Sequence, residues 1–208
     1  MADQQNFRLR VFFAKSGRCA MLSHLEVARA LERAVRRAAL PYAISQGFSP
    51  HMKIAFGAAL PVGVGGVSEC FDLMMTSYIA PERVEAALRE SSVPDLIVHR
   101  CTYIGPKDPA ASAAYPLCTY EALLSSVPLS LQLPESITVI RKKKERELVV
   151  ADFLVGDMKA AGATLTFTLR SCITGSLRAD VLLAEVLKVN PGIALKTLTR
   201  ISQKAESL

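Results

Sequence analysis

The pattern of apolar and polar positions in the first half of the chain predicts two helices between four strands. Apolar and polar residues alternate over 7–14 (FRLRVFFA), which predicts a strand, and apolar residues recur at helical spacing over 24–39, which predicts a helix that ends before Pro41. The order strand–helix–strand–strand–helix–strand is the ferredoxin-like arrangement. The remaining predicted elements of this half are strands at 53–56, 69–75 and 96–104, a helix at 81–91, and a glycine-rich connection at 57–66.

The second half predicts a smaller α+β module after a linker. Residues 105–116 (GPKDPAASAAYP) are rich in proline and alanine, so we place a boundary there, with one module at 1–104 and the other at 117–208. No sequence repeat is visible, although the second module could be a degenerate copy of the first. Its predicted elements are strands at 118–125 and 164–169, a helix at 178–189, and a hairpin of 137–140 with 148–155 around a charged tip at 141–146.

The start of the first helix carries the clearest local signal. Ser23-His24-Leu25-Glu26 has the S-x-x-E form of a capping box. At about 100° per residue the apolar residues of the helix gather on one side. The residues on the opposite side are Arg29, Arg33, Arg36 and Arg37. Arginines on one face are suited to bidentate phosphate contacts, although a solvated amphipathic helix has the same pattern.

The net charge is concentrated in this part of the chain. The whole sequence carries 25 Lys and Arg against 19 Asp and Glu, a net charge of +6. Residues 1–60 contain nine of the basic and three of the acidic residues, which accounts for the whole excess, since the remaining residues hold sixteen of each. This asymmetry indicates an anionic partner.

The loop after the helix is the second candidate site. Its sequence, SQGFSPHMK over 45–53, combines an aromatic residue with a histidine, a lysine, an amide and small hydroxyls, which are the groups of a single-stranded nucleic-acid contact. The alternative is a structured turn with Phe48 in the core. His24 and His51 could also act as an acid–base pair, whereas no spacing rule supports a metal site on them.

The composition limits the other classes of function. No apolar run reaches the roughly 18–20 residues that span a bilayer, and the first residues do not have the pattern of a signal peptide, so we expect a cytoplasmic protein. Five scattered cysteines without a C-x-x-C pair are expected to be buried thiols and cannot hold the three-cysteine cluster of a radical-SAM enzyme. Gly63-Val64-Gly65-Gly66 precedes a strand, which argues against a dinucleotide site.

Together these motifs resemble a known bacterial family. The serine–histidine–leucine–acid helix start, the paired arginines, the SQGFSPHMK loop and Leu60-Pro61-Val62-Gly63 are similar to radical-SAM-linked proteins of unknown function, domain-of-unknown-function family 2344. The resemblance is dense over 8–75. This sequence departs from the family pattern at Glu26, Ser49 and Met52, where the family has aspartate, asparagine and proline. Members of the family occur beside, or fused to, B12-binding-type radical-SAM proteins.

The resemblance implies an accessory role beside an enzyme. We expect a non-catalytic chain that binds no cofactor itself and presents RNA, such as tRNA or rRNA, to a radical-SAM enzyme that carries SAM and an iron–sulfur cluster. Two alternatives stay open: a metal-independent ferredoxin-like endoribonuclease that uses His24 and His51, and a pure protein–protein adaptor. The expected anion-binding residues are Ser23, His24, Arg29, Arg33, Arg36, Arg37, Ser45, Gln46, Phe48, His51 and Lys53.

Overall fold

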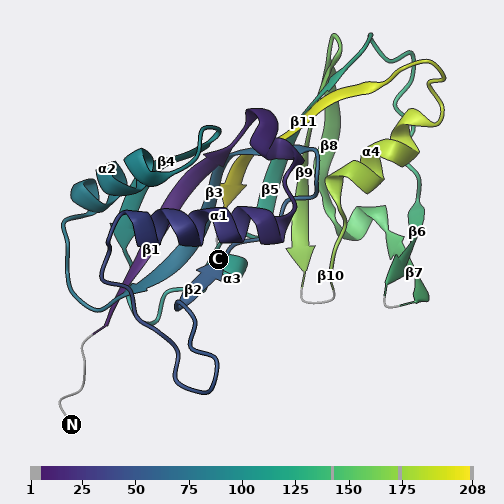
Figure 1. The fold of residues 1–208 in the computed structure, drawn as a ribbon. Helices are drawn as coiled ribbons and strands as arrows, with labels where there is room; N and C mark the ends of the chain where they lie inside the picture. The colour runs from purple at the N-terminus through teal and green to yellow at the C-terminus, as the bar shows by residue number, and fades with distance from the viewer. Residues whose placement is uncertain (1–5, 142, 173–174, 207–208) are drawn as a thin grey trace. The chain divides into compact units, whose positions relative to one another are not determined.

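The computed structural model describes residues 6–141, 143–172 and 175–206 of the chain. It divides into two compact units, Met1–Ala114 and Tyr115–Leu208 (Figure 1). Strands that pair antiparallel dominate both units, and helices are few, which confirms the predicted α+β class. None of the helices in the described part is long and apolar enough to cross a membrane.

The first unit contains four strands, two longer helices and two short helical turns. Its sheet has the order β2–β3–β1–β4, and every neighbouring pair is antiparallel. The register places Arg10 opposite Asp72 and Ile54 opposite Leu73. The elements are β1 (Phe7–Lys15), the 3₁₀ helix η1 (Gly17–Met21), α1 (His24–Arg37), β2 (Ile54–Phe56), β3 (Val64–Met75), α2 (Pro81–Ser91), β4 (Leu96–Tyr103) and α3 (Ala111–Ala114).

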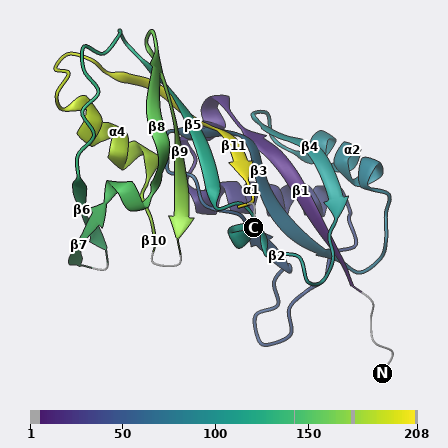
Figure 2. The same cartoon turned by 180° about the vertical axis from the view of Figure 1, so that it is seen from behind.

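One face of this sheet packs against α1 and α2 and forms the core. Side chains alternate between the two faces of a strand, so every second residue of β1 and β3 points toward the helices. The buried cluster joins Leu9 and Val11 of β1 and Leu73 of β3 to Leu31 of α1 and Leu88 of α2. Both helices lie in front of the sheet in Figure 1 and behind it in Figure 2. The residues between the core positions of β1 and β3 therefore lie on the face away from α1 and α2.

The second unit has a four-stranded sheet with one helix and a separate hairpin. The sheet has the order β8–β9–β5–β11, again antiparallel throughout, and β10 pairs with the end of β9. The strands β6 and β7 pair only with each other among the described residues. The elements are β5 (Leu117–Leu124), β6 (Ser136–Arg141), β7 (Lys144–Val149), the 3₁₀ helix η2 (Val150–Asp152), β8 (Leu154–Ala161), β9 (Thr164–Cys172), β10 (Gly175–Ser176), α4 (Ala179–Leu187) and β11 (Leu195–Lys204).

The two sheets have the same strand order. If β1, β2, β3 and β4 of the first unit and β5, β8, β9 and β11 of the second are each numbered along the chain, both sheets read second–third–first–fourth. A helix joins the third strand to the fourth in both units, α2 in one and α4 in the other. Between the first and second strands the first unit has α1, whereas the second unit has the β6–β7 hairpin and η2. The second unit thus repeats the topology of the first with a hairpin in place of one helix.

Most predicted elements of the first half are confirmed, but several boundaries differ. The strand β3 begins at Val64, so Val64–Gly66 belong to a strand and not to the predicted connection. In the second half the predicted strand at 148–155 is wrong, because β7 ends at Val149 and η2 separates it from β8. Lys144–Arg146 lie in β7 and not at the hairpin tip, and residue 142 lies outside the described part. The strand β11 was not predicted.

The segment that was predicted as a linker is partly fixed to the first unit. The carbonyl of Pro109 accepts hydrogen bonds from Arg8 and Arg10, and the amide of Ala111 donates to Asp72. The chain then forms the short helix α3, and the division between the units falls between Ala114 and Tyr115. The residues before α3 are therefore part of the first unit.

Candidate functional site

The helix α1 begins with the predicted capping box. Ser23 Oγ accepts a hydrogen bond from the amide of Glu26 at 3.4 Å, and the Glu26 carboxylate accepts from the amide and hydroxyl of Ser23 at 2.8 and 2.7 Å. The hydrogen bonds from Ser23 hold the pKa of Glu26 below its ordinary value. This carboxylate already occupies part of the positive end of α1, so Ser23 positions the helix and is not a free anion ligand.

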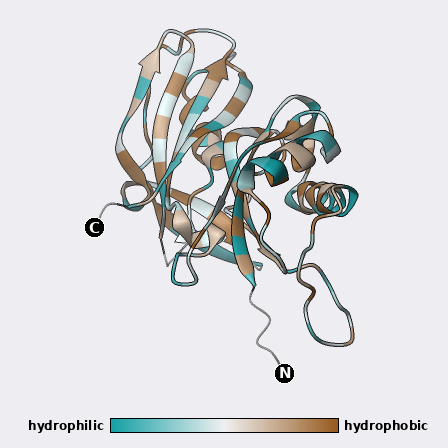
Figure 3. Cartoon of the chain, turned by 90° about the vertical axis from the view of Figure 1, so that its left-hand side faces the viewer, coloured by the Kyte–Doolittle hydropathy of each residue, from teal (hydrophilic) through white to brown (hydrophobic). Residues whose placement is uncertain are grey.

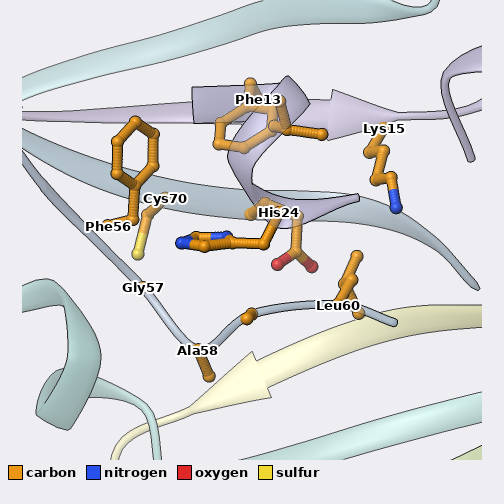
Figure 4. Close-up of a pocket in the computed structure, with 11 residues that line it drawn as sticks. Phe13, Lys15, His24, Phe56, Gly57, Ala58, Leu60 and Cys70 are labelled. Atoms are coloured by element: carbon orange, nitrogen blue, oxygen red, sulfur yellow. The ribbon is translucent and has the colours of Figure 1, made fainter. Parts of the chain in front are cut away.

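The capping box turns His24 toward a small pocket at the edge of the sheet. The imidazole lies edge-on to the ring of Phe56, with 5.5 Å between the ring centroids. Figure 4 shows this ring in the middle of the pocket, with Phe56 and Cys70 on one side and Lys15 and Leu60 on the other. The space has a volume of about 20 Å³, enough for about one water molecule.

Two buried charged residues line the same pocket. Lys15 and Glu69 are almost fully buried, and the Lys15 ammonium donates to the carbonyl of Pro61 at 3.4 Å. A Cβ atom on Gly66 would lie 2.4 Å from the Glu69 carboxylate, so only glycine allows this carboxylate to lie against the strand. The pocket therefore brings an imidazole, an ammonium and a carboxylate to one place. Such a combination is typical of functional sites, although buried ion networks can also be structural.

The four arginines of α1 lie on a different surface. They are exposed, and the buried residues of the helix lie on its other side. Hydrophobic and hydrophilic residues alternate around α1 in Figure 3. Arg36 forms an ion pair with Glu32 at 3.7 Å, and within the described residues Arg29, Arg33 and Arg37 form none. We call Arg29, Arg33, Arg36 and Arg37 the arginine face.

The loop at 45–52 is closed at its base and open at its tip. Ser45 Oγ lies 2.9 Å from His51 Nδ1 and accepts from the amide of His51 at 3.1 Å, and the amide of Ser45 donates to the carbonyl of His51 at 2.8 Å. Phe48 has a relative exposure of 109%, which excludes the alternative in which it packs in the core. The loop therefore presents an aromatic ring to solvent, while the bonds between Ser45 and His51 hold its two ends together. Gln46 is exposed beside it.

The predicted site residues do not meet in a single hollow. His24 lines the pocket at the sheet edge, whereas neither His51 nor any residue of the arginine face lines it. The imidazole of His51 is bonded within its own loop, to Ser45 and to the carbonyl of Ser49 at 3.2 Å. Lys53, next to that loop, lines a separate hollow with Arg8 and Asp72. The structure thus contains three neighbourhoods: the His24 pocket, the arginine face, and the loop with the hollow at its base.

Sequence reasoning missed the charged residues of the strands. Lys15, Glu69, Arg10 and Asp72 are buried, although their residue types are usually exposed. A detectable signal was present, because charged residues inside strands of otherwise apolar character point to paired or functional positions. Arg10 and Asp72 are 62 residues apart, and Lys15 is 46 residues from Pro61, so spacing alone could not identify these partners.

Four of the five thiols are buried as predicted, whereas Cys172 is only half-buried, so the prediction is wrong for that residue. Cys19, Cys70, Cys101 and Cys118 are buried, and burial raises the pKa of Cys101 to about 12. Burial also raises the pKa of Cys19. In the ranges that the structure describes, no group of three His, Cys, Asp or Glu side chains is placed to hold a metal ion.

A comparison of the chain with protein-family models identifies its family. A comparison with curated proteins gave no match. The model of one family matches residues 8–184, and its description is "Uncharacterized protein conserved in bacteria (DUF2344)". The match covers both the helix start with His24 and the loop with Phe48, and it continues into the second unit as far as α4. The chain therefore belongs to the uncharacterized bacterial family DUF2344.

Proposed function

We propose that this chain is a cytoplasmic accessory protein that holds RNA for a radical-SAM enzyme through the arginine face and the adjacent loop. The observation that carries the proposal is the exposure of all four arginines on one side of α1. Among the described residues one of the four, Arg36, forms an ion pair, with Glu32 at 3.7 Å. A guanidinium that makes no ion pair keeps its donors available for phosphate oxygens.

The charge of the first 60 residues supports the same proposal. In the fold acids from 61–114 offset part of this charge, since the first unit as a whole carries 13 Lys and Arg against 10 Asp and Glu, so the charge that supports the proposal is that of the exposed arginine face. A protein surface that binds an anionic partner through many weak contacts releases counterions, and its affinity then falls steeply with salt. The exposed ring of Phe48 adds a group that can stack on a base, which a purely electrostatic face lacks.

The fold we propose for the first unit is ferredoxin-like. The support is the strand order β2–β3–β1–β4 with antiparallel neighbours, together with the position of α1 between β1 and β2 and of α2 between β3 and β4. Both helices cover one face of the sheet, and the segment before α3 bonds to Arg10 and Asp72 on the other.

The partnership with a radical-SAM enzyme rests on the family. Members of the family that this chain resembles occur beside or fused to such enzymes, so we propose that the partner supplies SAM and the iron–sulfur cluster. The test is co-purification of the tagged chain from native cells, before and after RNase treatment. An enzyme that stays bound after RNase shows a direct protein contact. If no protein partner co-purifies even before RNase treatment, the accessory role is excluded.

A salt titration with bacterial tRNA tests the arginine face. The substitutions Arg29→Gln, Arg33→Gln and Arg37→Gln together should lower the slope of log affinity against log salt by about 2 to 3, because each phosphate contact contributes roughly 0.7 to 0.9. The matched control is Lys159→Gln, Lys196→Gln and Lys204→Gln, which removes the same charge from exposed residues of the second unit. Equal slopes for the two triple variants would contradict the proposal.

The endoribonuclease and adaptor alternatives give different outcomes. Incubation of the wild-type chain with the same tRNA in EDTA should leave the RNA intact if the chain only binds it. Cleavage that disappears in both His24→Ala and His51→Ala would favour the nuclease. Partner capture without any tRNA affinity would favour the adaptor.

A further inference from the structure

An open groove lies between α1 and α2, on the helical side of the first unit. Both helices lie on the same face of the sheet, in front of the strands in Figure 1. The groove has a volume of about 670 Å³, and pockets that bind small molecules have volumes of about 300–1,000 Å³. Small side chains line it and leave this space open, Ala38 directly after α1 and Ala87 and Ser91 of α2. Residues 92–94 complete the lining.

Two side chains of opposite charge line the groove without pairing. Arg37 is the last residue of α1 and a member of the arginine face, and Glu90 lies in the last turn of α2. Both are exposed, and among the residues that the structure describes neither forms an ion pair. The groove therefore offers a ligand guanidinium donors from one helix and carboxylate acceptors from the other.

The carboxylate of Glu90 indicates what kind of group the groove takes. A carboxylate has only acceptors and repels phosphate, so an RNA backbone phosphate is a poor occupant beside it. The donors that RNA offers to an acceptor are the N–H groups of its bases and its 2′-hydroxyls. An acid at the edge of the arginine face thus favours a base as the occupant of the groove.

Guanine is the base whose groups match this pair of side chains. Its N7 and O6 are adjacent acceptors, and their contact with an arginine is the commonest specific contact to a base. Its N1–H and N2–H₂ are adjacent donors, which a carboxylate can accept with both oxygens. Adenine and cytosine have a donor next to an acceptor on that edge, and uracil has one N–H donor, so guanine alone offers both pairs.

We propose that the groove binds a guanine base of the RNA whose phosphates lie on the arginine face. Arg37 donates to N7 and O6, and Glu90 accepts from N1 and N2. Arginine has five donors, so Arg37 can also contact a phosphate. This inference rests on the proposed function and specifies its substrate as RNA with an unpaired guanosine, because a base pair would occupy the edge that Glu90 contacts.

Four labelled oligomers test the two contacts. Each is a short fluorescein-labelled oligouridine whose central nucleotide is guanosine, inosine, 7-deazaguanosine or uridine. Inosine lacks the N2 amino group that donates to Glu90, and 7-deazaguanosine lacks the N7 acceptor for Arg37. The wild-type chain should bind the guanosine probe about 10- to 100-fold more tightly than the uridine probe. Each of the two analogues should lose about 5- to 10-fold of that affinity.

Glu90→Ala should act through the base alone. Guanosine and inosine should then bind equally, and the uridine probe should bind at least as tightly as before, because a negative charge near the phosphates is removed. Glu82→Ala removes the same charge from an exposed residue at the start of α2 and is the matched control. Alanine is the best helix former, so thermal unfolding of both variants should stay close to that of the wild type.

Arg37→Ala and Arg33→Ala form the second matched pair. Both remove one charge from the arginine face, so both should weaken binding of the uridine probe and lower its salt slope by about 0.7. Arg33 does not line the groove. Arg37→Ala should therefore also abolish the difference between guanosine and 7-deazaguanosine, whereas Arg33→Ala should keep it. Loss of this difference in both variants, or in neither, would contradict the assignment of Arg37.

The outcomes separate this inference from the proposed function. A wild-type chain that binds neither the probes nor tRNA would remove both. Salt-dependent binding with equal affinity for the guanosine, inosine and uridine probes would leave the arginine face and overturn the groove. A preference for guanosine over inosine that survives in Glu90→Ala would overturn it as well. Free GMP that binds as tightly as the guanosine probe would assign the groove to a free nucleotide and contradict RNA as the source of the guanine.

Discussion

The two units share a strand order but stabilise it by different means. In the first unit, the first and third strands are linked by the buried Arg10–Asp72 pair. In the second unit the corresponding strands are linked by neutral contacts, the hydroxyls of Thr119 and Thr168 at 2.9 Å and the stacked rings of Tyr120 and Phe167. The pairing of the first strand with the third is therefore charged in the first unit and neutral in the second at these positions.

The charged pairing has a cost that the neutral pairing lacks. Buried ion pairs often contribute less than apolar residues of the same shape, because removal of the charges from water is costly. The first unit also keeps a helix where the second has a hairpin, and that helix carries both His24 and the arginine face. The predictions below test how far the two units differ.

The largest effect is expected from removal of the shared carboxylate. Asp72→Ala leaves Arg10 buried without its counterion and should lower the free energy of unfolding by about 3–5 kcal/mol. Urea unfolding measures the total, and hydrogen exchange of the β1 and β3 amides localises it to the first unit. The matched change in the second unit, Thr168→Val, breaks a neutral hydrogen bond and should cost about 1 kcal/mol. Equal costs would contradict the contrast between the units.

Acid should destabilise the first unit through the same residue. Burial raises the pKa of Asp72, but the hydrogen bonds from Arg10 and Arg8 outweigh burial and hold the pKa below its ordinary value. A carboxyl with a lowered pKa stabilises the fold above its unfolded value of about 3.9, and this stabilisation is lost as the pH falls below that value. Urea midpoints of the first unit should therefore drop as the pH falls below about 4. The Asp72→Ala variant should show a smaller drop over the same range.

A smaller effect is expected at the helix starts. Ser23→Ala removes the capping hydroxyl of α1 and should cost about 1 kcal/mol of unfolding free energy. In α4 the N-cap is Arg178, whose side chain makes no capping hydrogen bond, so Arg178→Ala should cost less. Thermal unfolding of the two variants provides the comparison. A larger loss from Arg178→Ala would show that the capping box of α1 has little weight in the fold.

The sequence predicted the elements that have strong local signals. The capping box fixed the start of α1 at His24, and Pro81 fixed the start of α2, because both act within one helical turn. The strand β11 was missed because its side chains are mostly polar and its partners in β5, from Leu124 opposite Leu195 to Leu117 opposite Lys204, are 71 to 87 residues away in sequence. Strands of this kind are defined by their partners and not by their own periodicity.

The candidate site was predictable only in part, for the same reason. The exposure of the arginines followed from helical spacing within α1. The neighbours of His24 could not be predicted, because Lys15 and Glu69 reach the pocket through the pairing of β1 with β3. Arg8 was recognised as a basic residue of the first strand. Its position in the same hollow as Lys53 depends on the pairing of β1 and β2 with β3, which the sequence pattern did not predict.

The exchange of α1 for the β6–β7 hairpin has a consequence for protein engineering. The sheet of each unit keeps its order whichever segment joins its first strand to its second, so that crossover tolerates replacement. A helix with chosen surface residues could be grafted into the second unit at 125–153, between β5 and β8. A chain built in this way would carry its own helix α1 in one unit and a designed helix at the equivalent place in the other.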